Sequence, residues 1–137
     1  MKMRNALHAL FLLPAMVHGA TLEVRVDGLR EARGHVLIAL ADSAESWDGK
    51  AAPRARTRHA VAAGSETIRF DDLPPGTYAV SLFHDENDNG VMDKNVVGMP
   101  TEGYGFSRNP RVMRKATFEE ARFELAADGG EIVVELR

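Results

Sequence analysis

The chain has 137 residues, of which 17 are Lys or Arg and 20 are Asp or Glu, and it contains no cysteine. This length supports one domain with a sizeable core, and the lack of cysteine excludes a disulfide framework or a cysteine-linked lipid anchor. The net charge of −3 argues against a nucleic-acid-binding surface.

The first twenty residues have the pattern of a secretory signal peptide. Two basic residues precede the mostly apolar run Ala6–Val17, which is shorter than the roughly 20 apolar residues of a membrane span. Small residues predict cleavage after Gly19 or Ala20, so the mature chain begins at Ala20 or Thr21, and residues 21–137 form one domain. Cleavage removes two of the 17 basic residues and no acidic one, so the mature domain carries 15 basic and 20 acidic residues, a net charge of −5.

Five segments in the first part of the mature domain have the length and apolar pattern of β-strands. They are Thr21–Asp27, His35–Ala41, Arg54–Ala62, Ser65–Phe70 and Gly76–Asp85. The last has the strongest pattern, and every second side chain in it shares one face. Gly28–Gly34 joins the first two segments as a turn, so we expect them to form a hairpin.

Two features between these segments have alternative interpretations. Asp42–Pro53 begins with capping residues and predicts one helical turn, and it contains Trp47, the single tryptophan. We expect Trp47 to cover one end of the core, the alternative being a binding surface for a sugar or peptide. The three arginines of Arg54–Ala62 fit an edge strand, the alternative being a contact with an acidic partner.

The second half of the domain adds two more strands. Phe118–Ala121 predicts a single helical turn, and Arg122–Ala126 and Glu131–Leu136 alternate around the turn Asp128–Gly130. This arrangement indicates a second hairpin. With about seven short strands and one long loop, the chain predicts an all-β fold, an antiparallel β-sandwich of the immunoglobulin-like or prealbumin-like kind.

The loop that follows Gly76–Asp85 has the spacing of a calcium-binding loop. Oxygen-bearing side chains at every second position, followed by glycine, give the pattern D-x-N-x-N-G-x-x-D. Such side chains converge on one point when the backbone coils around a cation, and the glycine permits the sharp bend. The predicted Ca²⁺ ligands are Asp85, Asn87, Asn89, the carbonyl of Val91, Asp93 and, as the closing ligand, Glu102.

This interpretation of the loop has an alternative. The twelfth position is Val96, where calcium loops carry a bidentate glutamate, so Glu102 would have to close the site from further along the chain. Asn, Asp and Gly also gather in loops because they tolerate left-handed backbone and form side-chain turns. Residues 85–102 therefore form either a loop ordered by Ca²⁺ or an ordinary polar loop.

Catalysis has little support from residue spacing. The histidines that remain after cleavage, His35, His59 and His84, lack the spacing of a helical zinc site. Ser81, His84 and Asp85 do not predict a triad, because Ser81 and His84 point to opposite faces of a strand and no nucleophile elbow is present. Acid–base chemistry by His84 or by pairs of the nearby carboxylates remains as an alternative.

The chain resembles an uncharacterised bacterial family catalogued as domain of unknown function 2141. The resemblance rests on the opening strands and on residues 70–90, 92–109 and 118–125, and Arg108 stands where an asparagine is expected. Residues 70–85 are also similar to a strand of transthyretin-like and carboxypeptidase-regulatory-like sandwiches. The resemblance implies an extracytoplasmic sandwich and no established activity.

We expect a secreted or periplasmic β-sandwich that works as a binding module, with Ca²⁺ ordering residues 85–102. Tyr104 and Phe106 either anchor this loop on the sandwich or form a contact surface. The expected partner is an extracytoplasmic protein or a glycan, with no nucleic acid and no membrane span. One alternative is a small periplasmic hydrolase or isomerase using His84 and nearby carboxylates, and another is a structural or adhesive domain without a ligand.

Overall fold

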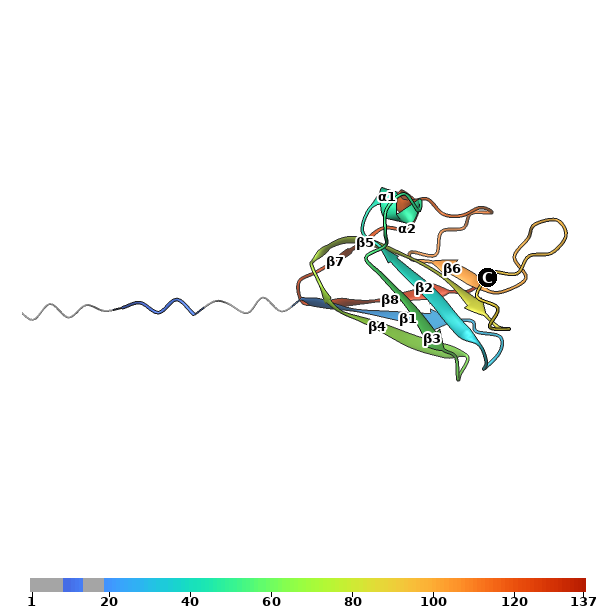
Figure 1. Ribbon diagram of the computed structural model, residues 1–137, viewed down its shortest axis with the longest axis horizontal. Helices are drawn as coiled ribbons and strands as arrows, with labels where there is room; N and C mark the ends of the chain where they lie inside the picture. Colours follow the sequence, from blue (N-terminus) through green and yellow to red (C-terminus); the bar gives the residue numbers. More distant parts are fainter. Residues whose placement is uncertain (1–8, 14–18) are drawn as a thin grey trace, which may run out of the picture.

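The computed structural model describes residues 9–13 and 19–137 of the chain (Figure 1). Within these residues it forms eight strands and two four-residue helices. In chain order these are β1 (Ala20–Asp27), β2 (His35–Ala41), α1 (Ala44–Trp47), β3 (Ala55–Ala60), β4 (Ser65–Leu73), β5 (Gly76–Asp85), β6 (Tyr104–Phe106), α2 (Phe118–Ala121), β7 (Phe123–Leu125) and β8 (Gly130–Glu135). The predicted all-β sandwich is confirmed, whereas most of the predicted leader, residues 1–20, lies outside the described residues.

The strands form two sheets that pack face to face. The smaller sheet has the order β4-β1-β8, and the larger has the order β3-β2-β5-β6, with β7 pairing the first residues of β5. Every described pair is antiparallel except β1 with β8, in which Leu22 lies opposite Gly130. The first and last strands of the domain therefore lie side by side.

Both predicted hairpins are wrong. Strands β1 and β2 lie in different sheets, because residues 28–34 carry the chain from one sheet to the other. Strand β7 pairs with β5, whereas β8 pairs with β1. The turn before β8 leads toward β1, and a Cβ on Gly129 would lie 2.6 Å from the carbonyl oxygen of Thr21. Turn residues show only that the chain reverses, and packing of the apolar faces decides which strand it meets.

The core lies between the sheets and follows the two-residue period of the strands. Its buried apolar side chains include Leu22, Val24, Val26, Val36, Ile38, Leu40, Ile68, Phe70, Tyr78, Val80, Leu82 and Val134. A second cluster covers one end of the larger sheet, where Trp47 packs against Phe106 with ring centroids 5.9 Å apart. Trp47 is 5 % exposed, and its indole N–H donates to the carbonyl oxygen of Ala116 at 2.8 Å, so its predicted role in covering the core is confirmed.

The predicted edge strand is also confirmed, because β3 is an outer strand of the larger sheet. Strand β6 was not predicted, since it has three residues within a glycine-rich run. It pairs with β5 where Gly105 passes over β8, and a Cβ on Gly105 would lie 2.6 Å from Val134 Cγ1. In the described part of the chain, neither helix has the length and apolar character needed to cross a bilayer.

Candidate functional site

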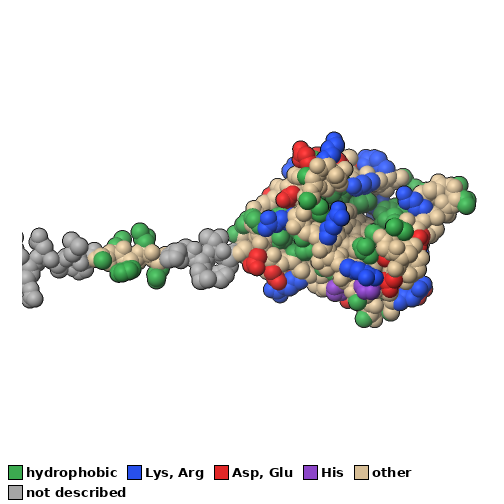
Figure 2. Space-filling view, viewed as in Figure 1, with side chains coloured by type: hydrophobic (Ala, Val, Ile, Leu, Met, Phe, Trp, Pro, Cys, Tyr) green, Lys and Arg blue, Asp and Glu red, His purple; other side chains and the backbone are tan. Residues whose placement is uncertain are grey.

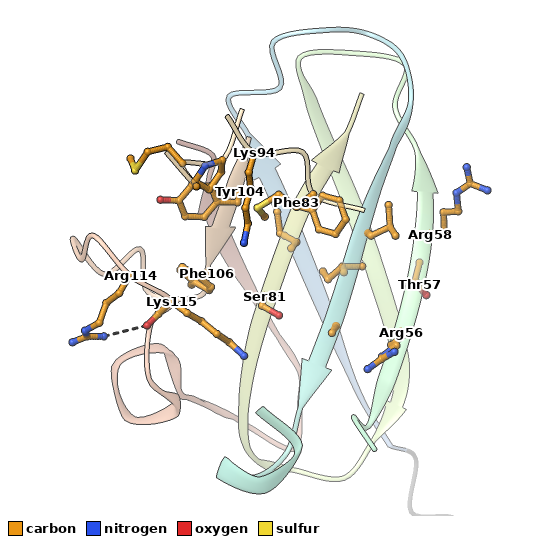
Figure 3. Close-up of a pocket in the computed structure, with 18 of the residues that line it drawn as sticks. Arg56, Thr57, Arg58, Ser81, Phe83, Lys94, Tyr104, Phe106, Arg114 and Lys115 are labelled. Atoms are coloured by element: carbon orange, nitrogen blue, oxygen red, sulfur yellow. Dashed lines mark hydrogen bonds between the residues drawn. The ribbon is translucent and has the colours of Figure 1, made fainter. Parts of the chain in front are cut away.

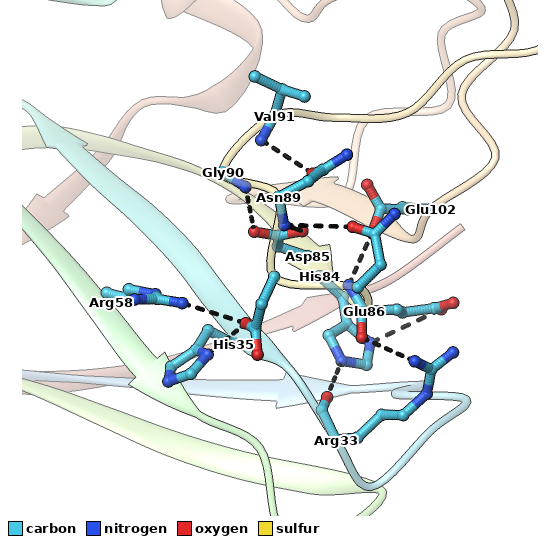
Figure 4. A network of polar contacts seen from close by, with 12 residues as sticks. Arg33, His35, Arg58, His84, Asp85, Glu86, Asn89, Gly90, Val91 and Glu102 are labelled. Atoms are coloured by element: carbon cyan, nitrogen blue, oxygen red, sulfur yellow. Dashed lines mark hydrogen bonds and ion pairs between the residues drawn. The ribbon is translucent and has the colours of Figure 1, made fainter.

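The loop between β5 and β6 begins at a buried carboxylate. Asp85 ends β5 and is 0 % exposed. Its carboxylate accepts the backbone N–H of Asn89 at 3.2 Å and that of Gly90 at 2.8 Å (Figure 4). These contacts coil the backbone around the Asp85 side chain, since a buried carboxylate needs hydrogen-bond donors.

Glu102 closes the other end of the same loop. Its side chain is 6 % exposed and accepts two backbone N–H groups, that of Glu86 at 2.7 Å and that of Asp93 at 2.9 Å. One carboxylate therefore joins the start, the middle and the end of the loop. Glu102 was predicted to close the loop as a Ca²⁺ ligand, and here both of its oxygens accept backbone N–H groups.

The middle of the loop brings three of the predicted calcium ligands together. The Asp93 carboxylate accepts the side-chain amides of Asn87 at 2.6 Å and Asn89 at 2.7 Å. The backbone N–H of Val91 donates to Oδ1 of Asn89 at 3.1 Å. Across residues 9–13 and 19–137, no three His, Asp or Glu side chains form a group that could hold a metal ion. In this arrangement the acids and amides are bonded to the loop itself.

His84 lies on the inner side of the larger sheet and is 1 % exposed. Its Nε2 donates to the carbonyl oxygen of Arg33 at 2.7 Å, whereas Nδ1 has no hydrogen-bond partner among the described residues. The Glu86 carboxylate lies 3.8 Å from Nδ1 and is bound by Arg30 at 2.8 Å. His84 lines neither the groove nor the smaller hollow described below, and its side chain is enclosed by the fold.

Asp88 ties the outer part of the loop to β2 and β3. Its carboxylate contacts His35 of β2 and accepts the guanidinium of Arg58 at 3.1 Å. The hydrogen bond with His35, followed by that with Arg58, lowers the pKa of Asp88. These contacts fix the outer part of the loop to β2 and β3 of the larger sheet.

The outer face of the larger sheet carries a groove that the sequence did not predict. It has a volume of about 750 Å³ and is covered at its sides by residues 92–100 and 113–115 (Figure 3). Two cross-strand rows from β3, β2, β5 and β6 form its floor, according to the strand register. The first row is Arg56, Ala39, Ser81 and Phe106, and the second is Arg58, Leu37, Phe83 and Tyr104. We call this site the outer-face groove.

The walls of the outer-face groove are apolar and its rim is basic. Its further lining residues include Met92, Met99, Pro100 and Met113 with the cations Lys94, Arg114 and Lys115. Figure 2 shows a hollow beside the projecting loop, with hydrophobic side chains inside it and Lys and Arg side chains around it. No Asp or Glu lines the groove. The rim of the groove is therefore basic although the chain as a whole is acidic, and the net charge of the chain does not show this local excess of cations.

A smaller hollow of about 250 Å³ adjoins the first row of the floor. The two hollows share Ala39, Ser81, Arg56 and Lys115. Lys115 is held in place by Trp47, because its ammonium donates to the Trp47 carbonyl at 2.8 Å and lies 5.1 Å from the centre of the indole ring. Trp47 lines the smaller hollow and contacts Phe106, so its fluorescence should respond to a ligand bound at this end of the groove.

The groove was not predicted from the sequence, because an apolar run such as that of β2 indicates a deeply buried strand and does not show that one of its faces lies open. The signal was present in β2, whose sequence HVLIALA is apolar on both faces, and in the outward Phe83 of β5. Ser81 lies on this outer face and His84 on the inner one, which agrees with the exclusion of a triad. Tyr104 and Phe106 pack in the cluster that contains Trp47, as expected if they anchor the loop, and both also line the groove.

The chain matches a family model over residues 24–133, which is most of its length. It therefore belongs to the bacterial family described as "Uncharacterized protein conserved in bacteria (DUF2141)", and the resemblance seen in the sequence is confirmed. No curated protein and no solved structure matches the chain.

Proposed function

We propose that this member of the family is a secreted or periplasmic binding module whose ligand lies in the outer-face groove. The observation that carries the proposal is an apolar hollow of about 750 Å³ built on a rigid sheet. Small-molecule sites in proteins are mostly apolar, carry a few polar groups and have volumes of about 300–1,000 Å³. The outer-face groove falls within this range of volumes, and its lining is mostly apolar with a few polar groups.

Binding accounts for the site better than the alternatives do. A hydrolase or isomerase based on His84 would need that side chain to reach a substrate, and it is 1 % exposed. A purely structural or adhesive domain gives no reason for an open apolar groove between two loops. The partner expected from the sequence, an extracytoplasmic protein or a glycan, remains a candidate occupant of the groove.

Calcium binding by residues 85–102 is a second candidate. Asn87 and Asn89 point their amides at the two oxygens of Asp93. Rotation of those amides by 180° would present oxygens at the same place, where a hard cation would find both carboxylate and amide ligands. Residues 92, 94 and 98–100 of this loop line the groove, so an ion bound here would fix one wall of the binding site.

A neutral apolar fluorophore tests the binding function. The purified protein is titrated with N-phenyl-1-naphthylamine, and we expect a saturable rise in probe emission at one molecule per chain. Ala39→Phe fills the floor of the groove and should abolish the rise. Thr67→Phe, at an exposed position of β4 in the other sheet, is the matched control and should leave it unchanged. Equal binding by the two variants, or no saturable binding by the wild type, would refute the proposal.

A further inference from the structure

We infer that the ligand of the outer-face groove is a free single-chain amphiphile with a terminal carboxylate. The carboxylate would lie between Arg56 and Lys115, and the aliphatic chain would lie along Leu37 and Phe83. This inference rests on the proposed function and adds the chemical class of the ligand.

The charges around the groove favour an anion. Five cations and no acid line the groove, although acids outnumber bases in the chain, and the smaller hollow that shares Arg56 and Lys115 adds one acid, Asp48. Arg58 is paired with Asp88 at 3.1 Å, and Arg114 with Glu120 at 2.7 Å. Within the described residues neither Arg56 nor Lys94 makes an ion pair. Since unpaired cations around an apolar hollow attract a negative group, the groove is complementary to an anionic ligand.

One end of the groove is suited to the charged group. Across the sheet Arg56 lies opposite Ala39, and Ala39 lies opposite Ser81. Because the side chain of Ala39 is a single methyl group, it leaves space between the guanidinium of Arg56 and the hydroxyl of Ser81. In Figure 3 the side chains of Arg56 and Lys115 lie on either side of Ser81. A guanidinium binds a carboxylate through two parallel hydrogen bonds, and a hydroxyl and an ammonium can complete its shell. These groups match a carboxylate at the end of a chain.

The other end is suited to an aliphatic chain. The next row of the floor replaces Ala39 and Ser81 by the larger Leu37 and Phe83. Three methionines also line the groove, and their unbranched thioether side chains adapt to an irregular apolar partner. The lining includes no Asn, Gln, Asp, Glu or His. A glycan needs such groups to bond its hydroxyls, so the lining favours an apolar chain over a sugar.

The test compares ligands that share one chain length and differ in head group. Dodecanoate, dodecyltrimethylammonium and dodecyl maltoside are titrated below the concentrations at which they form micelles, and calorimetry and Trp47 emission are recorded. We expect dodecanoate to bind at least about tenfold more tightly than the other two, since a charge-assisted hydrogen bond contributes about the free energy of one factor of ten. Trp47 emission should change with the same midpoint, because Trp47 contacts both Lys115 and Phe106.

Two arginine variants locate the charged group. Arg56→Gln should weaken dodecanoate binding about tenfold, by a larger factor than it weakens binding of the neutral N-phenyl-1-naphthylamine. Arg69→Gln removes an exposed arginine from β4 in the other sheet and should leave both affinities as in the wild type. Equal effects of the two variants on dodecanoate would overturn the assignment of Arg56.

The outcomes separate this inference from the function on which it rests. If the neutral probe binds and dodecanoate shows no preference over the other head groups, the ligand class is wrong and the binding function stands. If no probe binds, both fail. Association with vesicles of anionic lipid, without binding of free dodecanoate, would overturn the inference in favour of a membrane surface.

Discussion

Ser107 and Val80 are bonded to each other twice. The backbone N–H of Ser107 donates to the carbonyl oxygen of Val80 at 2.9 Å, and the backbone N–H of Val80 donates to Oγ of Ser107 at 2.9 Å. The hydroxyl of Ser107 in turn donates to the carbonyl oxygen of Ala121 at 2.5 Å. A side chain that is 0 % exposed thus takes the place of a strand partner beyond the end of β6 and joins it to α2.

Ser107→Ala should lower the free energy of unfolding by about 1–3 kcal/mol, because the variant leaves the buried N–H of Val80 without an acceptor. Urea denaturation followed by circular dichroism measures the change. Ser65→Ala is the matched control, since the Ser65 hydroxyl bonds to Asp27 at an exposed position. Similar losses in the two variants would show that the Ser107 hydroxyl does not carry this role.

Glu102→Gln should loosen the loop between β5 and β6. The carboxylate accepts two backbone N–H groups, and an amide side chain would turn a donor toward one of them. We expect a loss of about 1–3 kcal/mol and faster hydrogen exchange at the amides of Glu86 and Asp93. Glu119→Gln, where the side chain is 75 % exposed, should leave both exchange rates as in the wild type. Unchanged exchange in Glu102→Gln would contradict the role assigned to this carboxylate.

Gly34→Ala should be far more damaging than Gly49→Ala. Both glycines have positive φ, +69° and +76°, so each alanine carries the strain of the left-handed region. At Gly34 a Cβ would also lie 2.2 Å from the carbonyl oxygen of Asp85, whereas nothing lies within 4 Å at Gly49. Thermal unfolding should show a loss of about 2–5 kcal/mol for Gly34→Ala and about 1–2 kcal/mol for Gly49→Ala. Equal losses would mean that the contact at Asp85 imposes no constraint.

Ionised Glu120 should account for part of the stability that the protein loses at acidic pH. Its hydrogen bond with Arg114, followed by those with Thr117, lowers the pKa of Glu120 from 4.5 to about 2. Because the pKa is lower in the folded state, the ionised carboxylate stabilises the fold above pH 4.5 and loses this effect as the pH falls toward 2. The melting temperature of Glu120→Gln should therefore approach that of the wild type over this pH range. A constant difference between the two from pH 7 to pH 2 would contradict this origin.

Calcium at millimolar concentration should raise the melting temperature by several degrees over that in chelator, if the loop binds the ion as proposed. An ion at a hundred times its dissociation constant adds about 2.7 kcal/mol of stability. The rise should be lost in Asp93→Asn and kept in Asp128→Asn, which changes an exposed acid outside the loop. No rise with Ca²⁺ in the wild type would show the calcium proposal to be wrong.

The strand positions could be predicted from sequence because burial on one face leaves a two-residue period. His35–Ala41 and Gly76–Asp85 were predicted with the bounds that the structure shows. Strand pairing could not be predicted, since a turn such as Asp128–Gly130 has the same composition whether the chain folds back or crosses to another sheet. Strand β6 has too few residues to show a period, and its position depends on Gly105 fitting against Val134.

The polar residues of the loop were found from sequence, but their roles depend on backbone geometry. Asp85 and Glu102 were predicted to share a cation, and in the structure each binds backbone N–H groups of the loop. The outer-face groove depends on strand register, which places Arg56, Ala39 and Ser81 in one row across three strands. The spacing of these residues along the chain does not predict that they lie in one row.

The parallel pairing of β1 with β8 has a consequence for the biogenesis of the protein. A ribosome delivers β1 first and β8 last, so the edge of β1 that pairs with β8 stays open until synthesis of the domain is nearly complete. An open strand edge recruits other chains, and an incomplete product that stops before Gly130 presents one along β1. Products that lack β8 should therefore aggregate or be degraded, so only chains that include β8 should accumulate as folded protein.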